Sequence, residues 1–177
     1  MDFDTCLGIL STIEGGWTVD SGGPTYRGVT QETYDVWRRR HALPGRPVRE
    51  MTDAEMRAIY YENYWLPLHC GALPDGWAVF LFVQAVNLPW GDAVLIMQGA
   101  LMYEGAYTGA IDGAIGPMTI GAARSKPAAV FTAIQACIGH YAINSPPNEQ
   151  RGLIVGRLGK LKAAIERLGS AGAIDGS

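Results

Sequence analysis

The chain is poor in cysteine. It has three in 177 residues, Cys6, Cys70 and Cys137, an odd number placed far apart. Such a set does not form the disulfide framework that stabilises small secreted domains. Cys6 and Cys137 fall on apolar faces of expected helices, and this position predicts buried free thiols.

Basic residues are also scarce, because 14 Lys and Arg stand against 17 Asp and Glu, a formal net charge of −3. No basic field would collect phosphates, so we expect no nucleic-acid partner. The opening residues, "MDFDTCLGIL", contain no Lys or Arg and lack the positive region of a secretory signal. We therefore expect a protein made in the cytoplasm without a signal peptide.

The chain also lacks a long apolar run. The longest, from Trp77 to Val83, is far shorter than the roughly 20 residues that span a bilayer, and we expect no membrane insertion. Apolar residues still make up 48 % of the chain, which is enough for a packed core. The length favours one compact unit.

Helical spacing of apolar residues dominates the chain and predicts a mainly α-helical protein. The predicted helices cover residues 3–13, 31–40, 52–66, 77–87, 93–103, a short stretch from 117, 127–143 and 148–168. The clearest start is at Thr52, which forms a capping box with Glu55, while Met51 and Met56 form a hydrophobic staple. Residues 17–30 are rich in Gly, Asp, Ser and Pro, which predicts an irregular loop or a short hairpin.

An acidic residue stands at the end of the first predicted helix. Glu14 lies within the apolar stripe of that helix, directly before two glycines that end it. Loss of hydration there would raise the pKa of Glu14 and keep the proton that a general acid needs. Asp20 follows in a polar loop, where a carboxylate stays ionised. Two carboxyl groups in such different environments are typical of glycoside hydrolysis.

Two hydroxyl groups follow in the same region. Thr25 and Tyr26 are suited to position a water molecule or a sugar. A structural role is the alternative for all of these residues, because a glutamate before Gly-Gly is common at helix ends. The spacing alone does not name a substrate.

Five segments resemble a known family in their order along the chain. They are "EGGW", "DSGGPTYRGVT", "MTDAEMRAIYYENYWLPL", "FVQAVN" and "DGAIGPMT". Together they resemble glycoside hydrolase family 108, lysozyme-like N-acetylmuramidases described as phage-type endolysins or secretion-associated muramidases. The resemblance extends over residues 4–160.

The resemblance implies a lysozyme-like α+β fold, mostly α-helical, and cleavage of the β-1,4 bond between N-acetylmuramic acid and N-acetylglucosamine in peptidoglycan. The family's catalytic glutamate matches Glu14, and its second acidic residue and threonine match Asp20 and Thr25. The resemblance implies no metal and no cofactor. The stretch between Glu14 and Asp20 is shorter than the family's pattern, and Val83 stands where the family has an aspartate. Two alternatives therefore stay open: a lytic transglycosylase, and a peptidoglycan-binding protein with weakened catalysis.

Candidate substrate-binding residues are Tyr26, Tyr61, Trp65, Gln84 and Asn87. In the aromatic cluster of the third predicted helix, helical spacing puts positions 60 and 64 on one face and 61 and 65 on another. One pair belongs to the core, and we assign Tyr61 and Trp65 to the sugar cleft. Gln84 and Asn87 lie in an apolar helix, and such amides either hold the fold together or contact acetamido groups.

Two other motifs are better explained by structure than by binding. In "DGAIGPMT", Asp112 and Gly113 form a turn and Pro117 starts a helix. His69, Cys70 and His140 match no standard zinc spacing, so we predict no metal site.

The resemblance also suggests how the chain is divided. We expect a catalytic region at 1–90, a helical peptidoglycan-binding region at 91–168 packed with it as one compact unit, and a flexible tail at 169–177. We expect a monomer that acts on peptidoglycan glycan strands in the periplasm. Without a signal peptide, a holin or an export system would have to deliver it.

Overall fold

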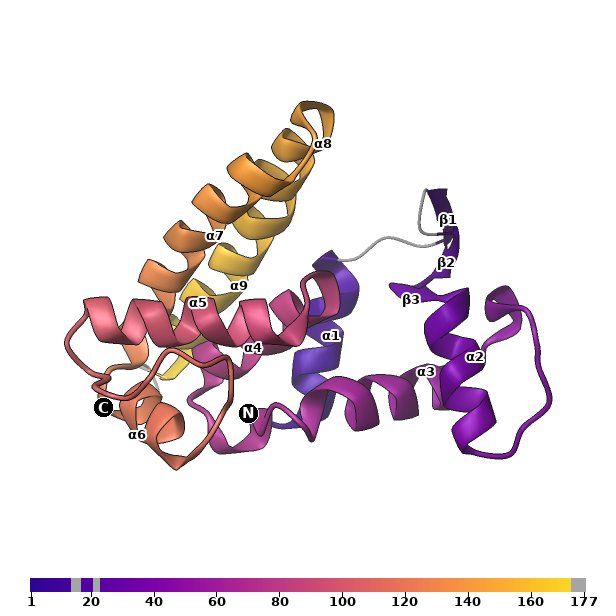
Figure 1. Cartoon of the computed structure of the whole chain (residues 1–177), viewed down its shortest axis with the longest axis horizontal. Helices are drawn as coiled ribbons and strands as arrows, with labels where there is room; N and C mark the ends of the chain where they lie inside the picture. Colours follow the sequence, from indigo (N-terminus) through magenta and orange to yellow (C-terminus); the bar gives the residue numbers. More distant parts are fainter. Residues whose placement is uncertain (14–16, 21–22, 173–177) are drawn as a thin grey trace.

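The computed structural model describes residues 1–13, 17–20 and 23–172 (Figure 1). The chain starts with α1 (Phe3–Ile13) and a three-stranded antiparallel sheet of β1 (Trp17–Asp20), β2 (Gly23–Tyr26) and β3 (Val29–Thr30). Helices form the rest of the described regular structure: α2 (Gln31–Arg40), α3 (Asp53–Tyr60), α4 (Asp75–Asn87), α5 (Trp90–Tyr103), α6 (Pro117–Ser125), α7 (Val130–Asn144), α8 (Pro147–Arg151) and α9 (Gly159–Gly172). Short 3-10 turns cover Val48–Glu50, Cys70–Ala72 and Pro127–Ala129, and π-helical segments cover Tyr61–Trp65 and Gly152–Leu158. The prediction of a mostly α-helical α+β protein with a hairpin after the first helix is confirmed.

Helix α4 is the centre of the core. Every residue from Trp77 to Ala85 is buried, so this helix is apolar all round and must be covered on all sides. Helices α1, α5, α7 and α9 pack against it. At the other end of the molecule, α2 and α3 lie below the small sheet (Figure 1).

Local signals set the starts of α2 and α3 as predicted. The Thr30 hydroxyl accepts a hydrogen bond from the backbone N–H of Thr33 and caps α2. Thr52 and Glu55 form the predicted capping box of α3, with both reciprocal hydrogen bonds present. Each cap satisfies backbone donors that a helix start leaves open.

The aromatic cluster after α3 differs from the prediction. The chain continues there as a π turn, in which the backbone N–H of Leu66 bonds to the carbonyl of Tyr61, five residues earlier (3.0 Å). The extra residue in this turn changes which side chains reach the core. Tyr60 and Tyr64 are still neighbours, with ring centroids 5.8 Å apart, and Tyr61 and Trp65 both contact Phe3, as the predicted pairing requires. Burial does not follow the pairs, because Tyr60 and Trp65 are both buried while Tyr61 is exposed.

Gln98 holds the long connection between α5 and α6. It is fully buried, and its carbonyl oxygen accepts hydrogen bonds from the backbone N–H of Asp112 and Gly113. Its amide nitrogen donates to the Asp112 carboxylate (2.8 Å) and to the carbonyl of Ala114 (3.0 Å). Gly113 has a φ of 72°, which favours glycine. The "DGAIGPMT" motif thus builds a turn, and Pro117 starts α6 as expected.

The three cysteines are free and buried, as predicted for Cys6 and Cys137. Burial raises the pKa of the Cys70 thiol to about 12. Burial also raises the pKa of Cys137 to about 12, against a smaller opposing effect of its hydrogen bond with Gln84. None of the three is therefore prepared to act as a thiolate nucleophile.

Candidate active site

The sheet after α1 is a compact antiparallel hairpin. In the β1–β2 pair, Thr18 lies opposite Thr25 and Asp20 opposite Gly23. β2 then pairs with β3 so that Thr25 also lies opposite Thr30. Thr25 is therefore at the centre of the sheet. The C-terminal end of α1 lies on the side of the molecule that faces this sheet (Figure 1).

A tight turn between β2 and β3 is tied to α3. Arg27 and Gly28 both have positive φ, 53° and 79°, as the common two-residue hairpin turn requires. The Tyr60 hydroxyl donates a hydrogen bond to the carbonyl of Arg27 (2.7 Å), and the Arg27 guanidinium pairs with the Asp53 carboxylate. These two contacts attach the turn to α3, and α3 thus fixes the position of the sheet.

The predicted catalytic residues are only partly within the described structure. Glu14 lies outside the described residues, directly after the last residue of α1. The backbone of Asp20 ends β1, and Thr25 is half-buried in the middle of β2. Tyr26 is half-buried beside it and packs against the core. The catalytic roles of Glu14, Asp20 and Thr25 stay predictions.

A groove starts where the sheet ends. We name it the α2–Trp90 groove; it has a volume of about 450 Å³. One wall is a face of α2, the next is the π turn and the residues after it, and the third is the first residue of α5. Its lining consists of Glu32, Thr33, Val36, Arg40, Glu62, Asn63, Tyr64, Pro67 and Trp90.

The aromatic residues of this groove are Tyr64 and Trp90, rather than the predicted Tyr61 and Trp65. Trp65 is 7 % exposed and packs edge-on against Phe3 in the core, with ring centroids 5.6 Å apart. Tyr61 is exposed, but it lies on Phe3 and faces a separate small pocket. From the sequence, the role of Tyr64 stayed undecided and Trp90 fell in a loop between two predicted helices. Their place in one groove depends on the π turn and on the start of α5, which the sequence pattern did not predict.

The two amides of α4 also have structural partners. Gln84 is fully buried, accepts a hydrogen bond from the Tyr141 hydroxyl (3.1 Å) and donates to the Cys137 sulfur (3.0 Å). Asn87 donates to the carbonyl of Val83 one turn earlier (2.9 Å). For Gln84 this position favours the structural alternative over contact with a sugar.

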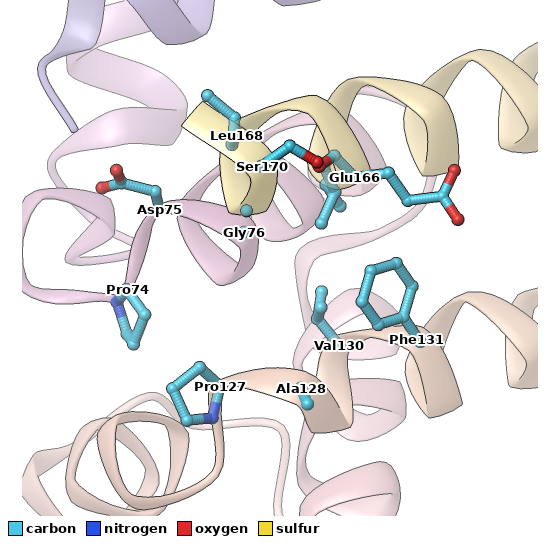
Figure 2. Close-up of a pocket in the computed structure, with 12 residues that line it drawn as sticks. Pro74, Asp75, Gly76, Pro127, Ala128, Val130, Phe131, Glu166, Leu168 and Ser170 are labelled. Atoms are coloured by element: carbon cyan, nitrogen blue, oxygen red, sulfur yellow. The ribbon is translucent and has the colours of Figure 1, made fainter. Parts of the chain in front are cut away.

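A larger pocket, of about 890 Å³, lies far from the sheet, between the start of α4, the start of α7 and the end of α9 (Figure 2). Its walls are mainly apolar and include Val130 and Phe131. Figure 2 shows the carboxylates of Asp75 and Glu166 at opposite margins. Asp75 binds the amino group of Met1 (2.5 Å), and Glu166 pairs with Lys162. Among the described residues that line this pocket, both carboxylates already have a cationic partner, which does not suit acid–base hydrolysis.

Metal and membrane sites are not apparent in the part of the chain that the structure describes. Within residues 1–13, 17–20 and 23–172, no three His, Cys, Asp or Glu side chains gather closely enough to hold a metal ion. Nor is any of the described helices long and apolar enough to cross a bilayer.

Comparisons with known proteins find a family model that matches part of the chain and a solved structure of similar fold. The model of the family described as Glycosyl hydrolase 108 matches residues 7–88, a segment that contains the second half of α1, the sheet, the π turn and α4. Among solved structures, that of Brucella abortus SagA resembles the chain, with a TM-score of 0.74 and 21 % sequence identity. The similarity covers 93 % of this chain and 94 % of that chain. At this identity the likeness concerns the fold. No curated protein sequence matches the chain.

Proposed function

We propose that the protein hydrolyses peptidoglycan at the β-1,4 bond between N-acetylmuramic acid and N-acetylglucosamine, because the model of the Glycosyl hydrolase 108 family matches residues 7–88 of the chain. The observation that carries the proposal is the family match itself. It includes the end of α1, the sheet with Thr25 at its centre, and two walls of the α2–Trp90 groove.

In this proposal, Glu14 is the general acid. It follows Ile13, which is buried at the end of α1, and an apolar setting favours the protonated carboxyl that can donate to the glycosidic oxygen. The sugar then develops positive charge, and Asp20 or a water molecule near Thr25 completes the reaction. The rigid attachment of the sheet through Tyr60 and Arg27 supports this role, because acid–base catalysis depends on fixed geometry.

The test uses purified sacculi and mass spectrometry of the released fragments. We expect the wild-type protein to release muropeptides with reducing N-acetylmuramic acid ends, and Glu14→Gln to release none. Glu50→Gln, a change at an exposed glutamate, is the matched control and should behave as wild type. Anhydromuramic ends would instead indicate a lytic transglycosylase. Binding to sacculi without any release would indicate the peptidoglycan-binding alternative.

We also propose that the second half of the chain contributes to binding of the peptidoglycan wall. Arg151, Lys160 and Arg167 are exposed on the last helical segment and would suit an anionic polymer. Binding of the Glu14→Gln protein to sacculi should then weaken as salt rises. Replacing these three residues by glutamine should remove most of that salt dependence, and an unchanged dependence would contradict this role.

A further inference from the structure

The α2–Trp90 groove contains polar side chains without a structural task. The side chains of Glu32, Arg40 and Asn63 make no hydrogen bond or ion pair with another residue that the structure describes. Glu62 differs, because its carboxylate accepts a hydrogen bond from the Trp37 indole (3.0 Å) and lies 3.3 Å from the His41 ring. One side of the groove is thus held in place, while three polar groups stay available to a ligand.

The aromatic residues of the groove are held in different ways. Trp90 is 45 % exposed, whereas Trp37, Trp65 and Trp77 are at most 7 % exposed. Tyr64 is half-buried and packs against Tyr60, with ring centroids 5.8 Å apart. A solvent-exposed indole beside a phenol ring that is held by packing suits a flat ligand with an apolar face.

The charge of the groove restricts the ligand further. The carboxylates of Glu32 and Glu62 and the guanidinium of Arg40 sum to −1. A phosphate-rich ligand would be repelled, and a purely apolar ligand would leave the polar groups without partners. A neutral ring with several hydroxyl groups and an amide fits both the aromatic and the polar lining.

The direction of the groove follows α2. Glu32, Val36 and Arg40 succeed one another at four-residue spacing along one helix face, a length of about 12 Å. The Glu32 end adjoins β3, so a polymer in the groove would run from the sheet toward the end of α2.

We propose that the α2–Trp90 groove binds one N-acetylhexosamine ring of the glycan strand, with Trp90 stacked on the ring and Asn63 bonded to the acetamido group. This inference rests on the proposed function and specifies where the strand lies. Trp90 and Asn63 act here as binding residues, and neither takes part in bond cleavage.

The kinetic test compares Trp90→Ala with Tyr103→Ala on solubilised glycan strands. Tyr103 is the matched control, because it is an 84 % exposed aromatic residue on the same helix. We expect Trp90→Ala to raise KM about tenfold with kcat changed less than about twofold, and Tyr103→Ala to have no effect. Trp90→Phe keeps a ring at this position and should recover most of the KM change caused by Trp90→Ala, which separates loss of stacking from misfolding of the alanine variant. An unchanged KM for Trp90→Ala would overturn the proposal.

The acetamido contact has its own test. Wild-type protein should lose about tenfold in kcat/KM when the strands are N-deacetylated. Asn63→Ala should show that loss already on acetylated strands and lose no more on deacetylated ones. If Asn63→Ala remained as sensitive to deacetylation as wild type, Asn63 would not be the partner.

A binding measurement separates failure of this site from failure of the proposed function. N-acetylchitohexaose should protect wild-type fluorescence from acrylamide, and Trp90→Phe should show no ligand-dependent protection. Protection by the acetylated but not the deacetylated hexamer would support the site even if no sacculi were cleaved. Absence of protection in wild type would refute it even if the wall were hydrolysed.

Discussion

Replacing Glu55 by glutamine tests the network that joins α2, one wall of the groove, to α3, the helix that leads into the π turn. The Glu55 carboxylate accepts hydrogen bonds from the Arg38 guanidinium (2.5 Å), the Tyr34 hydroxyl (3.0 Å), and the Thr52 backbone N–H and hydroxyl (2.9 and 3.0 Å). It also pairs with Arg46. Glutamine has nearly the same size, but its side chain is uncharged. Its amide NH2 group is a hydrogen-bond donor and would face groups of Arg38, Tyr34 or Thr52 that are also donors.

The expected cost follows from the burial of this pair. Arg38 and Glu55 keep only 6 % and 15 % of their side-chain surface exposed. Breaking a buried ion pair costs roughly 3–5 kcal/mol, and partial access of water reduces this to about 2–4 kcal/mol here. For a chain of this size the loss corresponds to a fall in Tm of roughly 5–15 °C.

The same network predicts a pH dependence. Desolvation favours a higher pKa for Glu55, but hydrogen bonds from Thr52 and Tyr34 and the charge of Arg46 outweigh it and lower the pKa. A carboxyl with a lowered pKa in the folded state contributes stability above its unfolded pKa, and this contribution is lost as the pH falls through the folded value. Wild type should therefore lose stability below about pH 4.5, the usual range of a glutamate.

Urea denaturation of wild type and Glu55→Gln between pH 7 and pH 3 measures both effects. The variant should be less stable at pH 7, and the difference should shrink toward pH 3. Glu50→Gln changes an exposed glutamate nearby and should alter neither quantity. A variant with wild-type stability at pH 7, or a difference that does not change with pH, would refute the reasoning.

The remaining predictions concern the sheet, the loop before α6 and the thiols. Tyr60→Phe removes the hydrogen bond to the carbonyl of Arg27, so the free energy of unfolding measured in urea should fall by about 1 kcal/mol and kcat in the sacculus assay should also fall. Unchanged values would mean that this bond does not hold the turn. Gln98→Ala should lower the free energy of unfolding by about 2–4 kcal/mol and expose residues 104–116 to limited proteolysis, because it removes several buried hydrogen bonds at once. A variant as resistant to the protease as wild type would contradict this role of Gln98. Cys70 and Cys137 should react with a disulfide reagent only after unfolding, since burial raises both thiol pKa values to about 12, and rapid reaction of the native protein would count against the packing described.

The sequence was most informative where structure depends on neighbouring residues. The capping box at Thr52 and Glu55 follows from signals within a few positions and was predicted correctly, and the predicted helix over 31–40 coincides with α2. The longest apolar run of the sequence, Trp77 to Val83, lies in α4 and is fully buried. These features need no knowledge of the rest of the chain.

The groove could not be predicted in the same way. Its walls come from α2, from the π turn and from Trp90, which are separated by tens of residues. The assignment of Tyr61 and Trp65 to the sugar cleft assumed that one pair is wholly buried and the other wholly open, whereas the structure buries one member of each pair, Tyr60 and Trp65. The buried position of Gln84 depends on Tyr141 and Cys137 of α7, another long-range contact.

The π turn connects the core to the groove. Tyr60 and Trp65 both pack edge-on against Phe82, with centroid distances of 6.0 and 5.8 Å, although a regular helix would not bring positions five apart to one face. Because the extra residue is taken up between them, Tyr64 and Asn63 are directed to the groove while the rings on either side stay in the core. π turns are rare and occur frequently at functional sites. The irregularity therefore supports the binding role of the groove independently of the polar side chains that line it.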